Sequence, residues 1–142
     1  MVILILILGL ILRLVNLNQS LWFDEAINVV YARDSSLIFY LTNYIIGDFH
    51  PPGWFFILWI FTNILGTAEI IVRLPSVIFG VLTIYVTYLI GKEFSKRIGL
   101  ISGLLMSIAP LHIYYSQEAR PYALGALAVS ASSYAFLKFL KK

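Results

Sequence analysis

The chain has 142 residues, of which 61% are hydrophobic and 12% are charged, with a mean hydropathy of +0.91. An ordinary soluble domain is near half apolar and a quarter charged, so this composition is typical of a membrane protein. The small formal net charge of +3 forms no single basic block, which gives no case for nucleic-acid binding, and the lack of cysteine excludes disulfides, thiolate metal sites and a cysteine nucleophile.

The first predicted helix covers residues 2–17. Its apolar start is similar to the core of a secretory signal, but no Lys or Arg precedes it and no small-x-small cleavage site follows, so we predict a retained membrane anchor. Arg13 interrupts this apolar run. We expect its side chain to snorkel to the lipid headgroups, which would still allow the helix to cross the membrane.

Two adjacent acids, Asp24 and Glu25, begin a short predicted helix that runs to about Arg33 inside a long loop, residues 18–69. A carboxylate in a first helical turn is stabilised by the helix dipole, typically by about 0.3–1 kcal/mol. Such a group can accept a proton from a hydroxyl, orient a water molecule or bind a cation. The alternative is structural, with one acid capping the helix and the other facing water.

An aromatic segment, residues 54–65, follows His50 and two prolines. Its apolar run is clearly shorter than the roughly 20 residues that a spanning helix needs, so an interfacial or re-entrant helix fits better than a crossing. His50 then lies near the membrane surface, where an imidazole can contact a phosphate or a metal. The alternative is that His50 is an ordinary loop residue before Pro-Pro.

Three later apolar stretches are predicted to cross the membrane, namely residues 70–91, 98–116 and 121–138. Basic residues gather at two places, Lys92 with Lys96 and Arg97, and Lys138 with Lys141 and Lys142. Cytoplasmic loops carry the surplus of Lys and Arg, and both clusters fall inside only if residues 54–65 do not cross. We therefore predict an all-α, polytopic fold with about four spans and an interfacial helix in the first external loop. Residues 1–142 form a single membrane domain in this prediction.

This topology puts the loop with Asp24 and Glu25 on the same non-cytoplasmic side as the turn with Glu118 and Arg120. A carboxylate and a guanidinium at headgroup level can hold an anionic lipid head, since Arg binds phosphate through a planar fork of donors. The alternative for this turn is a local ion pair between Glu118 and Arg120.

Two further polar residues, Arg73 and His112, lie in or beside apolar stretches. For Arg73 we favour snorkelling over a phosphate contact, and His112 receives no predicted role. The scattered glycines form neither a P-loop nor a dinucleotide-binding fingerprint. The sequence therefore predicts no pocket for a soluble nucleotide donor.

Four segments in chain order carry a family resemblance. They are Arg13 with LWFDEA at 21–26, HPP at 50–52, RLPSVIFGVLT at 73–83 and SIAPLHIYYSQEARPY at 107–122. In this order and with this topology, they resemble the N-terminal part of GT-C membrane glycosyltransferases of the family 39 type. This group includes protein O-mannosyltransferases and lipid A aminoarabinose transferases.

The resemblance implies a polyprenyl-phosphate-linked sugar as donor and its transfer, usually with inversion, to a hydroxyl of a protein or glycolipid acceptor outside the cytoplasm. Asp24, with Glu25 beside it, would be the catalytic base or a metal-linked group, and Glu118 would be the acid of the second loop. Arg120 and His50 would lie near the lipid phosphate, with Tyr122 in the same substrate-binding motif. The resemblance implies no definite cofactor and leaves a divalent metal open.

Full members of the group have many more membrane helices, so we expect this chain to be a fragment, a split subunit that needs a companion membrane chain, or a remnant without activity. Two other functions stay open. One is a non-catalytic membrane module whose charged groups make only structural contacts. The other is a small transporter that uses Arg73 or His112 inside the membrane.

Overall fold

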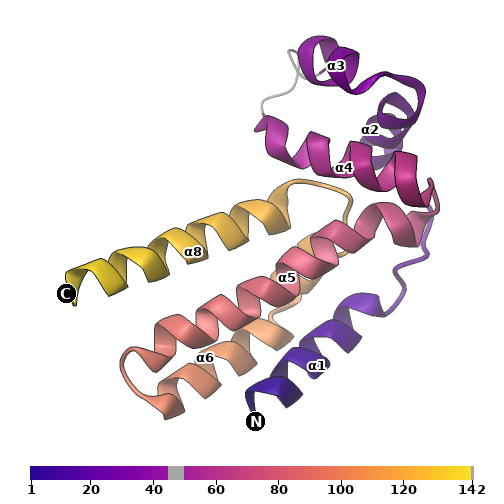
Figure 1. Cartoon of the computed structure of the whole chain (residues 1–142). Coiled ribbons are helices and arrows are strands. Elements are labelled where there is room, and N and C mark those ends of the chain that lie inside the picture. Colours follow the sequence, from indigo (N-terminus) through magenta and orange to yellow (C-terminus); the bar gives the residue numbers. More distant parts are fainter. Residues whose placement is uncertain (45–49, 142) are drawn as a thin grey trace.

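The computed structural model of the chain describes residues 1–44 and 50–141. Every regular element in these two ranges is helical (Figure 1). In chain order they are α1 (Val2–Leu14), α2 (Phe23–Asp34), α3 (Leu37–Phe39), the π-helix η1 (Tyr40–Tyr44), α4 (Pro52–Leu65), α5 (Glu69–Lys92), α6 (Lys96–Ile108), α7 (Pro110–Ser116) and α8 (Tyr122–Leu140). The predicted all-α fold is therefore confirmed.

Among the described helices, α5 and α8 are long and apolar enough to cross a membrane. Helices α6 and α7, bent by 61° at the break between them, would be a third crossing if the pair counts as one span. Helix α1 has 13 residues and ends before the predicted limit at Leu17, so it is about 20 Å long against roughly 30 Å of hydrocarbon. The crossing by α1, and with it the count of about four spans, stays a prediction.

Helix α5 is the centre of the bundle, with α1, α6 and α8 packed along it (Figure 1). Its contact with α6 is close, because a Cβ added to Gly91 would lie only 2.8 Å from the Cα of Gly99. Small residues let helix backbones approach each other in a membrane, where no hydrophobic effect drives helices together. Both termini and the connection between α5 and α6 lie toward one end of this bundle.

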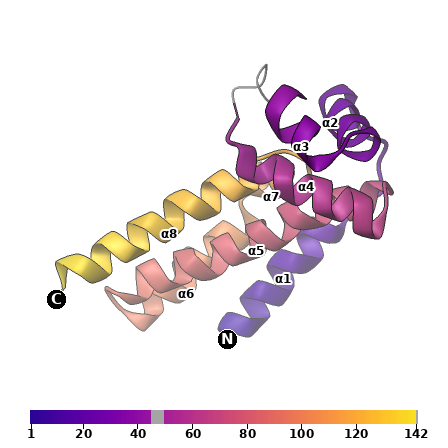
Figure 2. The ribbon, with the colours of Figure 1, turned by 45° about the horizontal axis from the view of Figure 1, so that its top comes forward.

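Helices α2, α3 and α4 gather at the other end of the bundle (Figures 1 and 2). Helix α2 matches the short helix predicted after Asp24, and α4 covers the aromatic segment 54–65. Helix α4 ends where Gly66 takes a φ of 109°, which favours glycine. This end has its own core, formed by Val29, Ala32, Tyr40, Trp54, Phe55, Leu58, Val72 and Ala119. The loops that carry the predicted site therefore rest on packed side chains.

The predicted single helix at 98–116 is in fact two helices, because the chain breaks before Pro110. Proline has no N–H, so it cannot make the helical hydrogen bond to the carbonyl of Met106. Arg13 fills this gap, since its guanidinium donates to the carbonyls of Met106 at 3.4 Å and Ser107 at 3.2 Å. The Arg13 side chain is completely buried, so the prediction that it snorkels is wrong. Unpaired carbonyls inside a membrane cost several kcal/mol, which explains why the guanidinium turns inward.

The end of α1 is capped in return by the turn that follows α7. The side-chain amide of Gln117 donates to the carbonyls of Leu12 and Arg13, each at 3.3 Å, and to that of Val15 at 2.7 Å. Carbonyls at the end of a helix have no intrahelical donor, so this amide satisfies groups that would otherwise need water. Arg13 and Gln117 thus hold α1 and the turn between α7 and α8 against each other.

Candidate functional site

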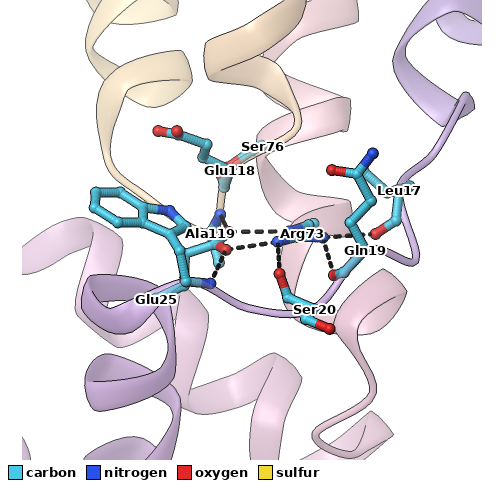
Figure 3. A network of polar contacts seen from close by, with 9 residues as sticks. Leu17, Gln19, Ser20, Glu25, Arg73, Ser76, Glu118 and Ala119 are labelled. Carbon is cyan, nitrogen blue, oxygen red and sulfur yellow. Dashed lines mark hydrogen bonds and ion pairs between the residues drawn. The ribbon is translucent and has the colours of Figure 1, made fainter.

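Glu25, in the first turn of α2, is the centre of a buried polar network (Figure 3). Its carboxylate accepts hydrogen bonds from the Arg73 guanidinium, with Nε 3.0 Å from Oε1 and Nη2 2.6 Å from Oε2. The backbone N–H of Ala119 donates to Oε1 at 2.6 Å, and that of Trp22 donates to Oε2 at 3.3 Å. Both oxygens of this fully buried carboxylate are therefore paired, as the burial of a charge requires.

Arg73, near the start of α5, uses its other donors on the segment between α1 and α2. Nη1 donates to the carbonyls of Leu17 at 2.9 Å and Gln19 at 2.6 Å, and Nη2 donates to that of Ser20 at 3.3 Å. Figure 3 shows Arg73 between these carbonyls and Glu25. Its side chain is only 6% exposed, so the prediction that Arg73 snorkels is wrong. These contacts also argue against Arg73 as a free cation for transport.

The first loop and the turn between α7 and α8 meet at this network. In addition to the bond from Ala119 to Glu25, the hydroxyl of Ser76 donates to the backbone carbonyl of Glu118. The two acidic turns, which the sequence places on the same side of the membrane, therefore contact each other in the structure. A charged acceptor makes a stronger hydrogen bond than a neutral one, so the Glu25 carboxylate holds the backbone of the turn firmly in place.

Asp24 has a different environment from its neighbour in the chain. Its Oδ2 is 3.6 Å from Nη2 of Arg120, and its side chain is 42% exposed. Arg120 is largely buried, and its Nε has no hydrogen-bond partner within the described ranges. The Arg120 guanidinium lies 5.8 Å from the ring centre of Tyr122, which in turn lies 6.0 Å from that of His50. The structure thus brings Asp24, Arg120, Tyr122 and His50 together.

An apolar groove of about 590 Å³ adjoins this group and lies between α4 and the first half of α8. His50 and Tyr122 line it together with Trp54, Leu124 and Gly125. Gly125 has no side chain, and a Cβ added to it would have no neighbour within 4 Å. The groove is therefore open at this position. The groove is apolar along its length, and its lining residue Tyr122 lies beside Arg120.

Glu118 lines a different cavity, of about 610 Å³, together with Arg73 and Tyr114. Its carboxylate points away from Arg73 in Figure 3. In the described part of the chain Arg120 pairs with Asp24, and the local ion pair considered between Glu118 and Arg120 is not found. Burial raises the pKa of the Glu118 carboxyl above its ordinary value of 4.5, although a hydrogen bond with Tyr114 opposes this shift.

Metal binding was left open by the sequence. Within residues 1–44 and 50–141, no group of three or more His, Asp or Glu side chains is placed to hold a metal ion. His112, which received no predicted role, has its Nδ1 2.7 Å from Nη2 of Arg13. Because Arg can only donate, Nδ1 is the acceptor, and His112 contributes to the capping of the helix break.

The sequence reasoning missed the residues that position the site, namely Arg13, Arg73, Ser76 and Gln117. A signal for the two arginines was present, because a charged residue in an apolar helix usually pairs inside the protein. Ser76 and Gln117 carried no such signal. Their roles depend on backbone carbonyls of segments that are far away in the chain.

A comparison with protein-family models identifies a match. The model described as dolichyl-phosphate-mannose-protein mannosyltransferase matches residues 49–142, which is most of the chain. The matched part includes His50, Arg73 and Arg120, whereas Asp24 and Glu25 precede it. No curated protein and no solved structure matches the chain.

Proposed function

The chain belongs to the dolichyl-phosphate-mannose-protein mannosyltransferase family, and from this membership we propose that it binds a polyprenyl-phosphate-linked sugar and takes part in its transfer to a hydroxyl of a protein or glycolipid. The observation that carries the proposal is the pair formed by Asp24 and Arg120. An exposed carboxylate lies 3.6 Å from a largely buried guanidinium, whose buried Nε has no hydrogen-bond partner among the described residues. A base and a phosphate-binding cation are the two groups that such a transfer needs.

Asp24 is the proposed general base. Its carboxylate takes the proton of the acceptor hydroxyl while the hydroxyl oxygen attacks the anomeric carbon of the sugar. The bond between the anomeric carbon and the phosphate oxygen breaks, and its electron pair leaves with the polyprenyl phosphate. Attack from the face opposite to the leaving group inverts the anomeric centre. Glu25 and Glu118 do not receive this proton in the proposal, and Glu25 acts as a positioning residue.

Arg120 and the groove between α4 and α8 form the proposed donor site. The contact of 3.6 Å between Arg120 and Asp24 is too long for a strong hydrogen bond, so a phosphate can take over the guanidinium and stabilise the charge of the leaving group. His50 and Tyr122 line the groove, and Tyr122 lies next to the Arg120 guanidinium. The apolar length of the groove, of about 590 Å³, suits the first isoprene units of the lipid.

The proposed reaction takes place at the non-cytoplasmic face of the membrane. The ends of α6 and α8 that lie away from the site carry or adjoin basic residues (Figure 1). These are Lys96, Arg97, Lys138 and Lys141. Because cytoplasmic ends of membrane helices carry the surplus of basic residues, the end with Asp24 and Arg120 is expected outside the cytoplasm.

Donor recognition can be tested without turnover, by titrating the purified chain in detergent with farnesyl phosphate and with farnesol. We expect the phosphate form to bind more tightly, and Arg120→Gln to weaken its binding about 10- to 100-fold, as for the loss of a charged hydrogen bond. Arg33→Gln is the matched control, because Arg33 is an exposed arginine paired with Asp34. Equal binding of the two ligands, or normal binding by Arg120→Gln, would contradict the donor site.

A further inference from the structure

The end of the bundle opposite the candidate site carries cations of two kinds. Lys138 and Lys141 donate to the Glu93 carboxylate at 3.3 and 3.0 Å. Lys96 and Arg97, the first two residues of α6, are exposed and form no ion pair or hydrogen bond through their side chains within the described part of the chain. Lys138 and Lys141 therefore neutralise Glu93, and Lys92 lies 6.0 Å from the ring centre of Tyr88. Within the described ranges, the adjacent charges of Lys96 and Arg97 stay unpaired.

The position of Lys96 and Arg97 favours an anion between or beside them. They lie in the first turn of α6, where the helix dipole opposes a cation and stabilises an anion. Ser95 caps this helix by accepting from the N–H of Ile98 at 3.1 Å. The backbone N–H groups of Lys96 and Arg97 have no intrahelical acceptor, because they belong to the first turn. A phosphate at this place would meet two side-chain cations and the start of a helix.

An apolar cavity of about 620 Å³ adjoins these two cations, between α1 and α6. Its apolar walls include Leu4, Ile5, Leu100, Ile101 and Leu104, and Lys96 and Arg97 also line it. Helix α6 turns Gly99 toward α5, where a Cβ would lie 2.8 Å from the carbonyl oxygen of Tyr88. The larger side chains of α6 are therefore left for the space beside α1.

We propose that this cavity binds one anionic phospholipid, with an acyl chain between α1 and α6 and the headgroup phosphate at Lys96 and Arg97. A lipid of this kind matches both features, whereas a soluble anion would leave the apolar walls uncovered and an apolar partner helix would leave the cations unpaired. Arg supplies a planar fork for phosphate oxygens and Lys a mobile point charge. The site lies at the basic end of the bundle, so the lipid belongs to the cytoplasmic leaflet.

The headgroup part of the proposal can be tested by native mass spectrometry of the purified chain, titrated with phosphatidylglycerol and with phosphatidylcholine. Each basic residue near an anionic headgroup contributes about fivefold in affinity, so Lys96→Gln combined with Arg97→Gln should weaken phosphatidylglycerol binding about 30-fold. Lys138→Gln combined with Lys141→Gln removes the same charge but from residues paired with Glu93, and should weaken binding less than about threefold.

The acyl part is tested separately with Leu104→Trp, which fills the cavity and keeps both cations. We expect it to reduce binding of phosphatidylglycerol but not of glycerol 3-phosphate, which has no acyl chain. Equal weakening by the two double variants would show a diffuse attraction to anionic surfaces and overturn the proposal. Equal affinity for phosphatidylcholine, normal lipid binding by Leu104→Trp, or a lipid-free dimer that covers this face would overturn it as well.

Discussion

Replacing Glu25 by Gln tests directly how the two loops of the site are held together. Glu25 accepts hydrogen bonds from the Arg73 side chain and from the backbone N–H groups of Ala119 and Trp22. Gln has the same shape, but it carries no charge and offers one acceptor oxygen and an amide that only donates. The variant therefore leaves the guanidinium without its counter-ion and turns a donor toward other donors.

The expected loss of stability follows from the burial of this ion pair. Removing one partner of a buried pair typically costs about 3–5 kcal/mol, because the remaining charge stays buried and unpaired. The side chains of Arg73 and Glu25 are 6% and 0% exposed. Water therefore cannot reach the Arg73 guanidinium to take the place of the lost carboxylate. Three carbonyls still accept from Arg73. We therefore expect Glu25→Gln to lower the free energy of unfolding by about 3 kcal/mol, the lower end of this range.

The measurement is unfolding of the purified chain in mixed micelles, with sodium dodecyl sulfate as denaturant and helicity followed by circular dichroism. Asp34→Asn is the matched control, because Asp34 also pairs with an arginine, Arg33, but both side chains are more than half exposed. Exposed pairs contribute little, so the control should unfold as the wild type does. Arg73→Gln should lose about as much stability as Glu25→Gln, and the double variant should lose less than the sum of both.

Two results would refute this account of the loops. If Glu25→Gln unfolds at the same denaturant concentration as the wild type, the buried ion pair does not hold them. Strictly additive losses in the double variant would also contradict the pairing, because residues in contact show a coupling energy of about 0.5–3 kcal/mol.

Three further variants test the other parts of the site. Asp24→Asn should lower sugar transfer in membranes about 10²- to 10⁴-fold with unchanged unfolding, because its side chain is 42% exposed, and normal transfer would remove the base role. Arg13→Met should lower the free energy of unfolding by about 2–3 kcal/mol, since the carbonyls of Met106 and Ser107 lose their donor; wild-type unfolding would show that the helix break needs no cap. For Glu118, the raised pKa means that stability is lost as pH rises from 4.5 through that pKa. Glu118→Gln should remove this slope, and an unchanged pH profile of unfolding would contradict it.

The long helices could be predicted from the sequence because their limits depend on local composition. The predicted stretches at 70–91 and 121–138 correspond closely to α5 (Glu69–Lys92) and α8 (Tyr122–Leu140). A helix in lipid must satisfy its own backbone hydrogen bonds and expose apolar side chains to the lipid. Its position in the chain can therefore be predicted from hydropathy alone. The distribution of Lys and Arg predicted that the two acidic turns share one side of the membrane, and in the structure these turns lie in contact.

The partners of buried polar side chains could not be predicted in the same way. Snorkelling is the natural expectation for Arg13 and Arg73 when only their distance from a helix end is known. Whether such a side chain turns inward depends on what lies beside the helix, and here that is a broken helix for Arg13 and a buried carboxylate for Arg73. These contacts join segments that only tertiary packing brings together.

The different environments of Asp24 and Glu25 follow from helix geometry. Successive residues on an α-helix point about 100° apart, so two adjacent acids cannot face the same surroundings. Once Glu25 turns inward to Arg73, Asp24 must turn elsewhere, and it lies beside Arg120 with almost half of its side chain exposed. A carboxylate that is fully occupied by four donors has no lone pair to spare for a substrate proton, whereas an accessible one does. In the proposed mechanism the two adjacent acids therefore have separate tasks: Glu25 holds the loops together, and Asp24 stays accessible to the acceptor hydroxyl.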